Sequence, residues 1–226
     1  MSVIAISTIA CMVAAFLVCG IPSGLIIAKH SKEHVDVRTV GSGNIGMTNV
    51  ARSAGAGAAA LTFLCDAGKG LVAMLLCRLV VANVAFGGDF GATSPLGEFG
   101  WVATLLYMSC VLGHVYSPYL GFHGGKGISV GFGAALGLYW PVALLMLLVF
   151  LVLAIPTRYV SLGSVAADIA LPIICFSLGI RGLRLVPILV VMVVVAFAHR
   201  KNIVKLANGT ERKFTVHKQG SEGGHK

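Results

Sequence analysis

Charged residues are scarce in this chain of 226 residues, and their scarcity limits the class of protein. Lys, Arg, Asp and Glu together supply 11% of the residues, whereas hydrophobic residues supply 57%. An ordinary soluble domain carries about 25% charged residues, so this chain has too little charge to cover a surface that faces water. The composition excludes a disordered chain, argues against a soluble enzyme and indicates a membrane protein.

The short alternating segments that build a membrane β-barrel are also missing. The chain has long uninterrupted apolar runs instead, and they lie at about 3–28, 54–86, 98–116, 128–157, 160–180 and 185–198. A helix needs about 20 apolar residues to cross a bilayer. We therefore predict an all-α integral membrane protein.

The run over residues 128–157 leaves two interpretations open. It could form one long tilted helix, but Trp140-Pro141 lies near its middle, and a proline can end one helix and begin another. Counted as a hairpin, it gives about seven transmembrane helices, with the N-terminus out and the C-terminus in. We prefer this count because it places most Lys and Arg, and the short polar motif loops, on the cytoplasmic face.

Acidic residues are scarcer than basic ones, with 8 against 17, and the formal net charge is +9. Basic residues are typical of cytoplasmic loops and attract anionic lipid, so we predict a membrane lipid partner and no nucleic acid. We see no repeat and no second domain. The prediction is a single polytopic membrane domain over residues 1–212, followed by a basic, flexible cytoplasmic tail over residues 213–226.

Three catalytic signatures are absent. There is no Gly-x-Ser-x-Gly sequence, so acyl transfer through a covalent serine is not indicated. No His is followed five residues later by Asp, a spacing common in soluble-facing acyltransferases. No cluster has metal-ligand spacing, and we predict neither a metal nor a cofactor.

The first polar motif is VGSGNIGMTNVAR, residues 40–52. Its glycines, Gly43 among them, let the backbone approach a ligand and turn N–H groups toward an anion. Neutral hydrogen-bonding groups come from Ser42, Asn44, Thr48 and Asn49. Arg52 supplies a planar fork suited to phosphate. The motif indicates an anion site, with a capped polar loop as the alternative.

The second polar motif is GHVYSPYLGFHGGKGIS, residues 113–129. Its glycine stretch, which holds Gly124, Gly125, Lys126 and Gly127, is similar to a nucleotide P-loop. The required Gly before it and the required Ser or Thr after Lys126 are missing, so we reject that interpretation. A loop that presents one ammonium beside His114 and His123 favours phosphate or carboxylate binding.

Two further motifs, RYVSLGS at residues 158–164 and HRKN at residues 199–202, are each typical of a basic membrane boundary. His199 and Asn202 are three residues apart and share a helix face. Asp66 and Lys69 have the same spacing inside an apolar run. A charge within a membrane needs a partner, and we interpret this pair as a structural ion pair. The alternative is that it supports the polar site.

Together these motifs resemble the bacterial integral-membrane glycerol-3-phosphate acyltransferase family that uses acyl phosphate as donor. The resemblance rests on GSGNIGMTNVAR, on GH followed by FHGGKG, on RYVSLGS, on HRKN with NGTE, and on Asp66-x-x-Lys69-Gly70. It implies transfer of a fatty acyl group from acyl phosphate to the sn-1 hydroxyl of glycerol 3-phosphate, which gives lysophosphatidate and phosphate. It also implies a multi-pass location in the bacterial plasma membrane, and the soluble enzyme that makes acyl phosphate as a candidate partner.

The resemblance and the motifs together predict the site residues. The catalytic group comprises Arg52, His114, Lys126, His199 and Asn202. The substrate-binding group comprises Ser42, Gly43, Asn44, Thr48, Asn49, Gly124, Gly125, Gly127, Ser161 and Ser164. The chain departs from the family pattern at three places, Met47 for Ala, His123 for Lys, and Ser129-Val130 for Ala-Thr. The change at His123 removes a phosphate-facing charge or makes it pH-dependent.

Three alternatives stay open. The hydroxyl proton could pass to His114 as a general base or to the donor phosphate itself. The chain could instead be a small polytopic transporter of an anionic metabolite, with Asp66 and Lys69 on its pathway. A scaffold without chemistry is the third. The acyl chain preference and the oligomeric state are not predicted.

Overall fold

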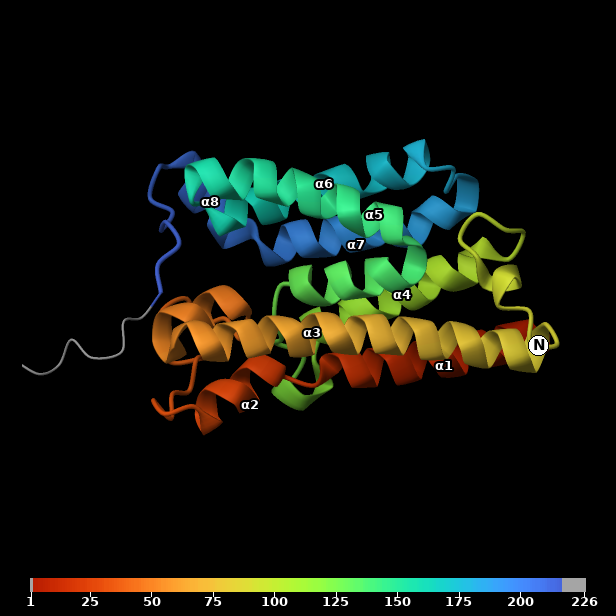
Figure 1. The fold of residues 1–226 in the computed structure, drawn as a ribbon, viewed down its shortest axis with the longest axis horizontal. Helices are drawn as coiled ribbons and strands as arrows, with labels where there is room; N and C mark the ends of the chain where they lie inside the picture. Colours follow the sequence, from red (N-terminus) through yellow and green to blue (C-terminus); the bar gives the residue numbers. More distant parts are fainter. Residues whose placement is uncertain (1, 217–226) are drawn as a thin grey trace, which may run out of the picture.

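The computed structural model describes residues 2–216, and that part of the chain folds into helices without strands (Figure 1). The α-helices are α1 (Val3–Gly20), α2 (Ser23–His30), α3 (Met47–Ala85), α4 (Gly100–Val115), α5 (Ile128–Thr157), α6 (Val160–Ser177), α7 (Leu185–Ala198) and α8 (Arg200–Ala207). Three short 3-10 helices are η1 (Phe90–Thr93), η2 (Pro118–Leu120) and η3 (Gly182–Arg184). The all-α prediction is confirmed.

The first apolar run, residues 3–28, is two helices rather than the single one we expect from its length. α1 ends at Gly20, and α2 begins after Pro22, which precedes it as the N-cap residue. Proline lacks the N–H that would continue the helix. The break takes the carbonyl of Ile21 out of the helical pattern, and it accepts from the N–H of Ser23 at 3.0 Å and from the Lys69 ammonium at 2.6 Å.

The hairpin interpretation of residues 128–157 is confirmed by the backbone of α5. Tyr139 is extended, with φ −162° and ψ 105°, and divides α5 into arms over 128–138 and 140–157. A Cβ added at Gly133 would lie 1.8 Å from the carbonyl oxygen of Ala67, so the first arm packs tightly along α3. The second arm returns beside α6 (Figure 1).

Arg78 of α3 closes this break. Pro141 has no N–H to donate to the carbonyl of Gly137, four residues earlier. Arg78 donates to that carbonyl at 2.7 Å and to the hydroxyl of Thr93 at 3.2 Å. The guanidinium of Arg78 therefore replaces the backbone donor that Pro141 lacks. A buried guanidinium would be costly in a membrane if it did not have such hydrogen-bond partners.

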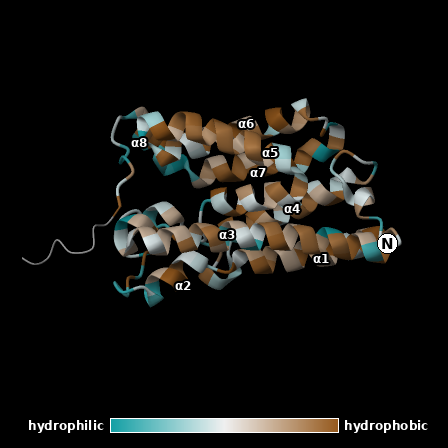
Figure 2. Ribbon diagram, viewed as in Figure 1, coloured by the Kyte–Doolittle hydropathy of each residue, from teal (hydrophilic) through white to brown (hydrophobic). Residues whose placement is uncertain are grey.

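α1, α3, α4, the two arms of α5, α6 and α7 run alternately between the two ends of the bundle (Figure 1). Within the described residues, four helical stretches are long and apolar enough to cross a membrane, with α1 and α2 counted as one, or five if the bent pair of α7 and α8 is one span. Hydrophobic residues follow the helices, and hydrophilic ones gather toward their ends (Figure 2). The protein is thus a multi-pass membrane protein. The count of seven crossings and their orientation remain predictions.

The loops before α3, before α5 and before α6 lie with α8 at the end opposite the N-terminus (Figure 1). Part of the tail that we expect to be flexible is docked at this end. The N–H of Phe214 donates to the carbonyl of Arg158 at 2.8 Å, and Phe214 packs against buried residues of α2 and α3. Residues 217–226 of the predicted tail lie outside the described part.

Candidate active site

The polar motifs, which lie far apart in the sequence, meet around one cavity of about 460 Å³. All five residues of the predicted catalytic group line it, namely Arg52, His114, Lys126, His199 and Asn202. Seven of the predicted substrate-binding residues do so as well, namely Ser42, Asn44, Thr48, Asn49, Gly127, Ser161 and Ser164. Gly43, Gly124 and Gly125 do not line the cavity.

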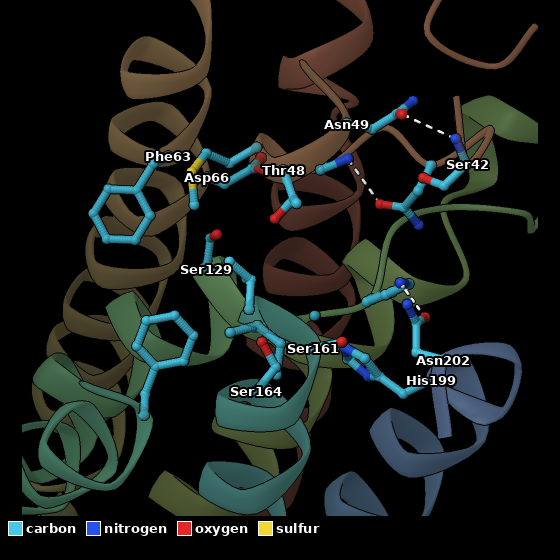
Figure 3. A pocket seen from close by; sticks show the side chains of 18 of the residues that line it. Ser42, Thr48, Asn49, Phe63, Asp66, Ser129, Ser161, Ser164, His199 and Asn202 are labelled. Atoms are coloured by element: carbon cyan, nitrogen blue, oxygen red, sulfur yellow. Dashed lines mark hydrogen bonds between the residues drawn. The ribbon is translucent and has the colours of Figure 1, made fainter. Parts of the chain in front are cut away.

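The loop of the first motif is held in shape by its own asparagines. The side chain of Asn49 donates to the carbonyl of Val37 at 2.8 Å and accepts from the N–H of Ser42 at 3.0 Å. The side chain of Asn44 accepts from the N–H of Gly46 at 2.8 Å. This folding turns Ser42 and Thr48 toward the cavity (Figure 3).

The same contacts leave fewer N–H groups for an anion than the predicted glycine nest requires. The N–H groups of Ser42 and Gly46 are already donated to the two asparagines, and the N–H of Gly43 donates to the carbonyl of Val40 at 3.0 Å. Gly43 has φ +69° and is exposed. Its function is to permit the turn, because L side chains rarely adopt that backbone conformation.

Arg52 projects from the first turns of α3 into the same cavity. One of its terminal nitrogens donates to the carbonyls of Arg212 at 3.3 Å and Lys213 at 3.4 Å. Its Nε is buried and has no hydrogen-bond partner among the described residues. A buried, unpaired donor on a guanidinium is a strong indication that a ligand oxygen binds there.

Gly124 and Gly125 of the second motif shape the site rather than face it. The N–H groups of Gly124 and Gly125 donate to the carbonyls of Val115 at 2.9 Å and His114 at 3.0 Å. A Cβ at Gly125 would lie only 2.1 Å from Nε2 of His114. The lack of a side chain at these two glycines lets the loop pack closely against the histidine. They face the histidine and not the cavity.

Lys126 connects the second motif to the last one. Its ammonium donates to the side-chain oxygen of Asn202 at 2.5 Å, and the amide nitrogen of Asn202 donates to Glu211 at 3.0 Å. Burial lowers the pKa of Lys126 to about 8. The Glu211 carboxylate opposes this shift, whereas the positive charges of Arg52 and Lys205 lower the pKa further. Lys126 is thus mostly an ammonium at pH 7 and loses its charge in the mildly alkaline range.

Both histidines of the predicted group are buried, with 4% of His114 and 2% of His199 exposed. Nδ1 of His199 lies 2.9 Å from the carbonyl oxygen of Val195, one turn earlier in α7. Nδ1 of His114 faces the Asp66–Lys69 pair of α3. His199, Asn202 and Ser161 point into the cavity from one side (Figure 3).

His123 is exposed and does not line the cavity; its Nδ1 is 2.6 Å from the carbonyl oxygen of Gly121. The departure from the family pattern at His123 therefore removes no charge from the cavity wall. Ser161, at the start of α6, has a buried hydroxyl without a partner among the described residues. The third motif thus contributes an unpaired hydroxyl to the same cavity that holds the unpaired nitrogen of Arg52.

Four charged residues of the cavity wall are not among the predicted site residues, namely Asp66, Lys205, Glu211 and Arg212, although Asp66 is considered as support for the site and Glu211 is part of NGTE. Lys205 shares the helix face of Asn202 at the three-residue spacing used for His199, so that signal was present in the sequence. Glu211 and Arg212 lie in the segment after α8, and only the fold brings them above Arg52.

The other half of the cavity wall is apolar. Its residues come from α3, both arms of α5 and α6, and they are Ala60, Phe63, Ile128, Phe132, Met146, Leu147, Phe150, Val160 and Ala167. The rings of Phe63 and Phe132 stack with their centroids 6.1 Å apart. One cavity therefore offers cations and hydroxyls at the end of the bundle and a hydrophobic lining between helices, which suits a ligand with a charged head and an apolar chain.

Comparison with known proteins agrees with a cavity for a ligand that has a charged head and an apolar chain. The sequence model of a family described as "Glycerol-3-phosphate acyltransferase" matches residues 9–209. A glycerol-3-phosphate acyltransferase of Geobacter sulfurreducens is 40% identical over 200 residues, which cover 88% of this chain and 94% of the relative. One of Brucella anthropi is 36% identical over 211 residues, with 93% and 95% covered.

Two solved structures are also similar. A crystal structure of PlsY (YgiH), an integral membrane glycerol 3-phosphate acyltransferase in its glycerol 3-phosphate form, superposes with a TM-score of 0.78 at 34% identity. The lysophosphatidic acid form of PlsY (YgiH) gives a TM-score of 0.76 at 33% identity. Each match covers 92% of this chain and 96% of the other.

Proposed function

The chain belongs to the glycerol-3-phosphate acyltransferase family, and from this premise we propose that it moves a fatty acyl group from acyl phosphate to the sn-1 hydroxyl of glycerol 3-phosphate. The products are lysophosphatidate and inorganic phosphate, in the first step of phospholipid synthesis. The proposed location is the bacterial plasma membrane, with the site on the cytoplasmic face. The proposed partners are the two substrates, membrane lipid and the soluble enzyme that makes acyl phosphate.

The observation that carries this proposal is the two-part cavity. Its polar end brings together four cationic side chains, Arg52, Lys126, Lys205 and Arg212, whereas its other end is lined by apolar residues of α3, α5 and α6. Acyl phosphate and lysophosphatidate each have a phosphate at one end and a hydrocarbon chain at the other. A cavity of the same polarity can hold either molecule, with the reacting carbonyl at the boundary.

The chemistry asks little of the protein beyond positioning. Acyl phosphate is a mixed anhydride, so its carbonyl is already activated and no covalent enzyme intermediate is needed. The glycerol hydroxyl oxygen forms a bond to the acyl carbon, the bond from that carbon to the phosphate oxygen breaks, and phosphate leaves with the electron pair. The hydroxyl proton passes to a site histidine or to the leaving phosphate. The protein holds the two phosphates close together and excludes water.

Each predicted residue takes a place in this scheme. Arg52, Ser42 and Lys126 hold the phosphate of glycerol 3-phosphate, because they supply two cations and a hydroxyl to the cavity wall. His114, His199 and Asn202 orient the donor phosphate or the attacking hydroxyl. Further hydrogen bonds to the substrates come from Thr48, Ser161 and Ser164. Gly43, Gly124 and Gly125 act on the shape of the loops.

Transport of an anionic metabolite is the rival function. A transporter usually binds its substrate near the midplane of the membrane, between broken helices. The break in α5 at Tyr139 would suit that pattern, but Tyr139 does not line the cavity. The polar lining of the cavity gathers at one end, where a substrate from water and a substrate from lipid can meet. This position favours the enzyme.

Replacement of Arg52 tests the proposed site. The purified protein in lipid is given palmitoyl phosphate and glycerol 3-phosphate, and phosphate release is followed. Arg52→Ala removes a charge-assisted contact of about 1.5–3 kcal/mol, so we expect the KM for glycerol 3-phosphate to rise at least about tenfold. The control is Arg181→Ala; that guanidinium lies over the ring of Phe176 and outside the cavity. Equal effects of the two changes, or none from Arg52→Ala, would reject the proposed phosphate site.

A further inference from the structure

Asp66 and Lys69 form a buried ion pair on α3, with 2.7 Å between Nζ of Lys69 and Oδ1 of Asp66. The Lys69 ammonium is fixed from a second side, because it donates to the carbonyl of Ile21 at 2.6 Å and lies 3.4 Å from the hydroxyl of Ser23. Both contacts come from the break between α1 and α2. The ammonium therefore has a fixed position that two separate parts of the fold determine.

This ammonium faces one particular nitrogen of the site. Nζ of Lys69 is 3.4 Å from Nδ1 of His114, whereas Oδ1 of Asp66 is 3.9 Å from the same nitrogen. An ammonium can only donate hydrogen bonds, so its approach favours a lone pair on Nδ1. The carboxylate is too distant to accept a hydrogen from Nδ1. In the neutral ring, the hydrogen of His114 is consequently on Nε2.

His199 has the opposite arrangement. Its Nδ1 lies 2.9 Å from the carbonyl oxygen of Val195, and a carbonyl can only accept, so Nδ1 carries the hydrogen. In the neutral ring, Nε2 of His199 then has the lone pair. The two buried histidines of one cavity are thus held as different tautomers. The partner of His114 is an ammonium, which donates, and the partner of His199 is a backbone carbonyl, which accepts.

We propose that Lys69 is a positioning residue that fixes His114 as its Nε2–H tautomer. On the function proposed above, His114 then donates a hydrogen bond from Nε2 to a phosphate or carbonyl oxygen, and it cannot take the hydroxyl proton at that nitrogen. Gly125 completes the arrangement, since a side chain there would collide with Nε2 at 2.1 Å. The structural ion pair of the sequence analysis thereby has an effect on the chemistry, and His114 is removed from the candidates for the general base.

The tautomers can be read directly in the substrate-free protein. The full chain is prepared in lipid nanodiscs with ring-¹⁵N histidine, and His114→Gln and His199→Gln samples identify the two sets of signals. The ¹⁵N shifts of the two neutral tautomers are well separated. We expect an Nε2–H pattern for His114 and an Nδ1–H pattern for His199. An Nδ1–H pattern for His114, or hydrogen on both of its nitrogens at neutral pH, would overturn the proposal.

A second variant tests the role of the pair without leaving an unpaired charge in the membrane. Asp66→Asn with Lys69→Met removes both charges at once. Loss of a fixed donor costs about 10²–10³-fold in kcat at comparable sites, so we expect kcat to fall by at least about tenfold, with a smaller change in the KM for glycerol 3-phosphate. The His114 signals should move toward a mixture of tautomers. The control, Asp36→Asn with Lys29→Met, removes a partly exposed pair 3.5 Å apart, whose carboxylate also pairs with Arg38 at 2.6 Å, and should change neither.

Two results separate this inference from the proposed function. If the predicted tautomers are seen but no acyl transfer occurs, the function fails and the positioning by Lys69 stands. If acyl transfer occurs and the double variant keeps both the wild-type kcat and the wild-type His114 signals, the pair is structural only and the inference is wrong. The direct reading of tautomers in the wild-type chain does not depend on whether the double variant folds.

Discussion

The charge of Lys126 should control glycerol 3-phosphate capture in the alkaline range. Burial lowers the pKa of this lysine to about 8. A lysine is charged below its pKa, so the ammonium is about 90% populated at pH 7 and about 10% populated at pH 9. If only the ammonium form holds the phosphate, the apparent affinity falls with that fraction as the pH rises. The expected loss is about tenfold, or about 1.4 kcal/mol.

The measurement is kcat/KM for glycerol 3-phosphate at pH 7, 8 and 9, with palmitoyl phosphate held in excess. kcat/KM reports groups of the free enzyme, whereas kcat reports the bound state. A bound phosphate dianion favours the charged form of Lys126, so kcat should vary less than kcat/KM. Hydrolysis of the donor without enzyme is subtracted at each pH.

Lys126→Arg is the matched variant, because a guanidinium stays charged over the whole range. We expect its kcat/KM to be lower than that of the wild type at pH 7 but nearly constant up to pH 9. A wild-type kcat/KM that does not fall between pH 7 and pH 9 would refute the reasoning. The same tenfold fall in Lys126→Arg would assign the pH dependence to another group.

Two further predictions concern packing. Gly125→Ala places a Cβ 2.1 Å from Nε2 of His114 and should lower kcat/KM by at least about tenfold. The control is Gly68→Ala, where a Cβ meets no atom within 4 Å, and it should leave kcat/KM unchanged. Equal activities of the two variants would show that the His114 ring has room to move. Arg78→Met removes the donor to the carbonyl of Gly137 and should destabilise the fold by about 1–3 kcal/mol, measured as a lower midpoint of thermal unfolding in detergent. An unchanged midpoint would contradict the closing role of that guanidinium.

The hairpin of α5 could be predicted because a proline and the balance of Lys and Arg gave two independent signals for one break. The break between α1 and α2 could not, since no charge or polar stretch interrupts residues 3–28. Pro22 was visible in the sequence, but prolines also occur inside membrane helices, as Pro172 does in α6. Only the carbonyl of Ile21, taken by Lys69, shows why the chain breaks there.

The residues that line the cavity could be predicted where residue chemistry decides and less well where loop geometry decides. Arg52, Lys126 and His199 could be selected because phosphate chemistry calls for such groups. The glycines could not be assigned, because a glycine that faces a ligand and a glycine that lets a loop pack give the same sequence pattern. Glu211 and Arg212 reach the cavity through the docking of Phe214, a tertiary contact that no local pattern encodes.

The most direct test of the account is a comparison of acyl donors. The purified protein in lipid is incubated with glycerol 3-phosphate and either palmitoyl phosphate or palmitoyl-CoA, and both lysophosphatidate and free phosphate are measured. The account predicts lysophosphatidate and phosphate in equal amounts from palmitoyl phosphate, phosphate release that requires glycerol 3-phosphate, and no product from palmitoyl-CoA. Product from palmitoyl-CoA alone would contradict the donor, and no product from either donor in a folded sample would contradict the enzyme.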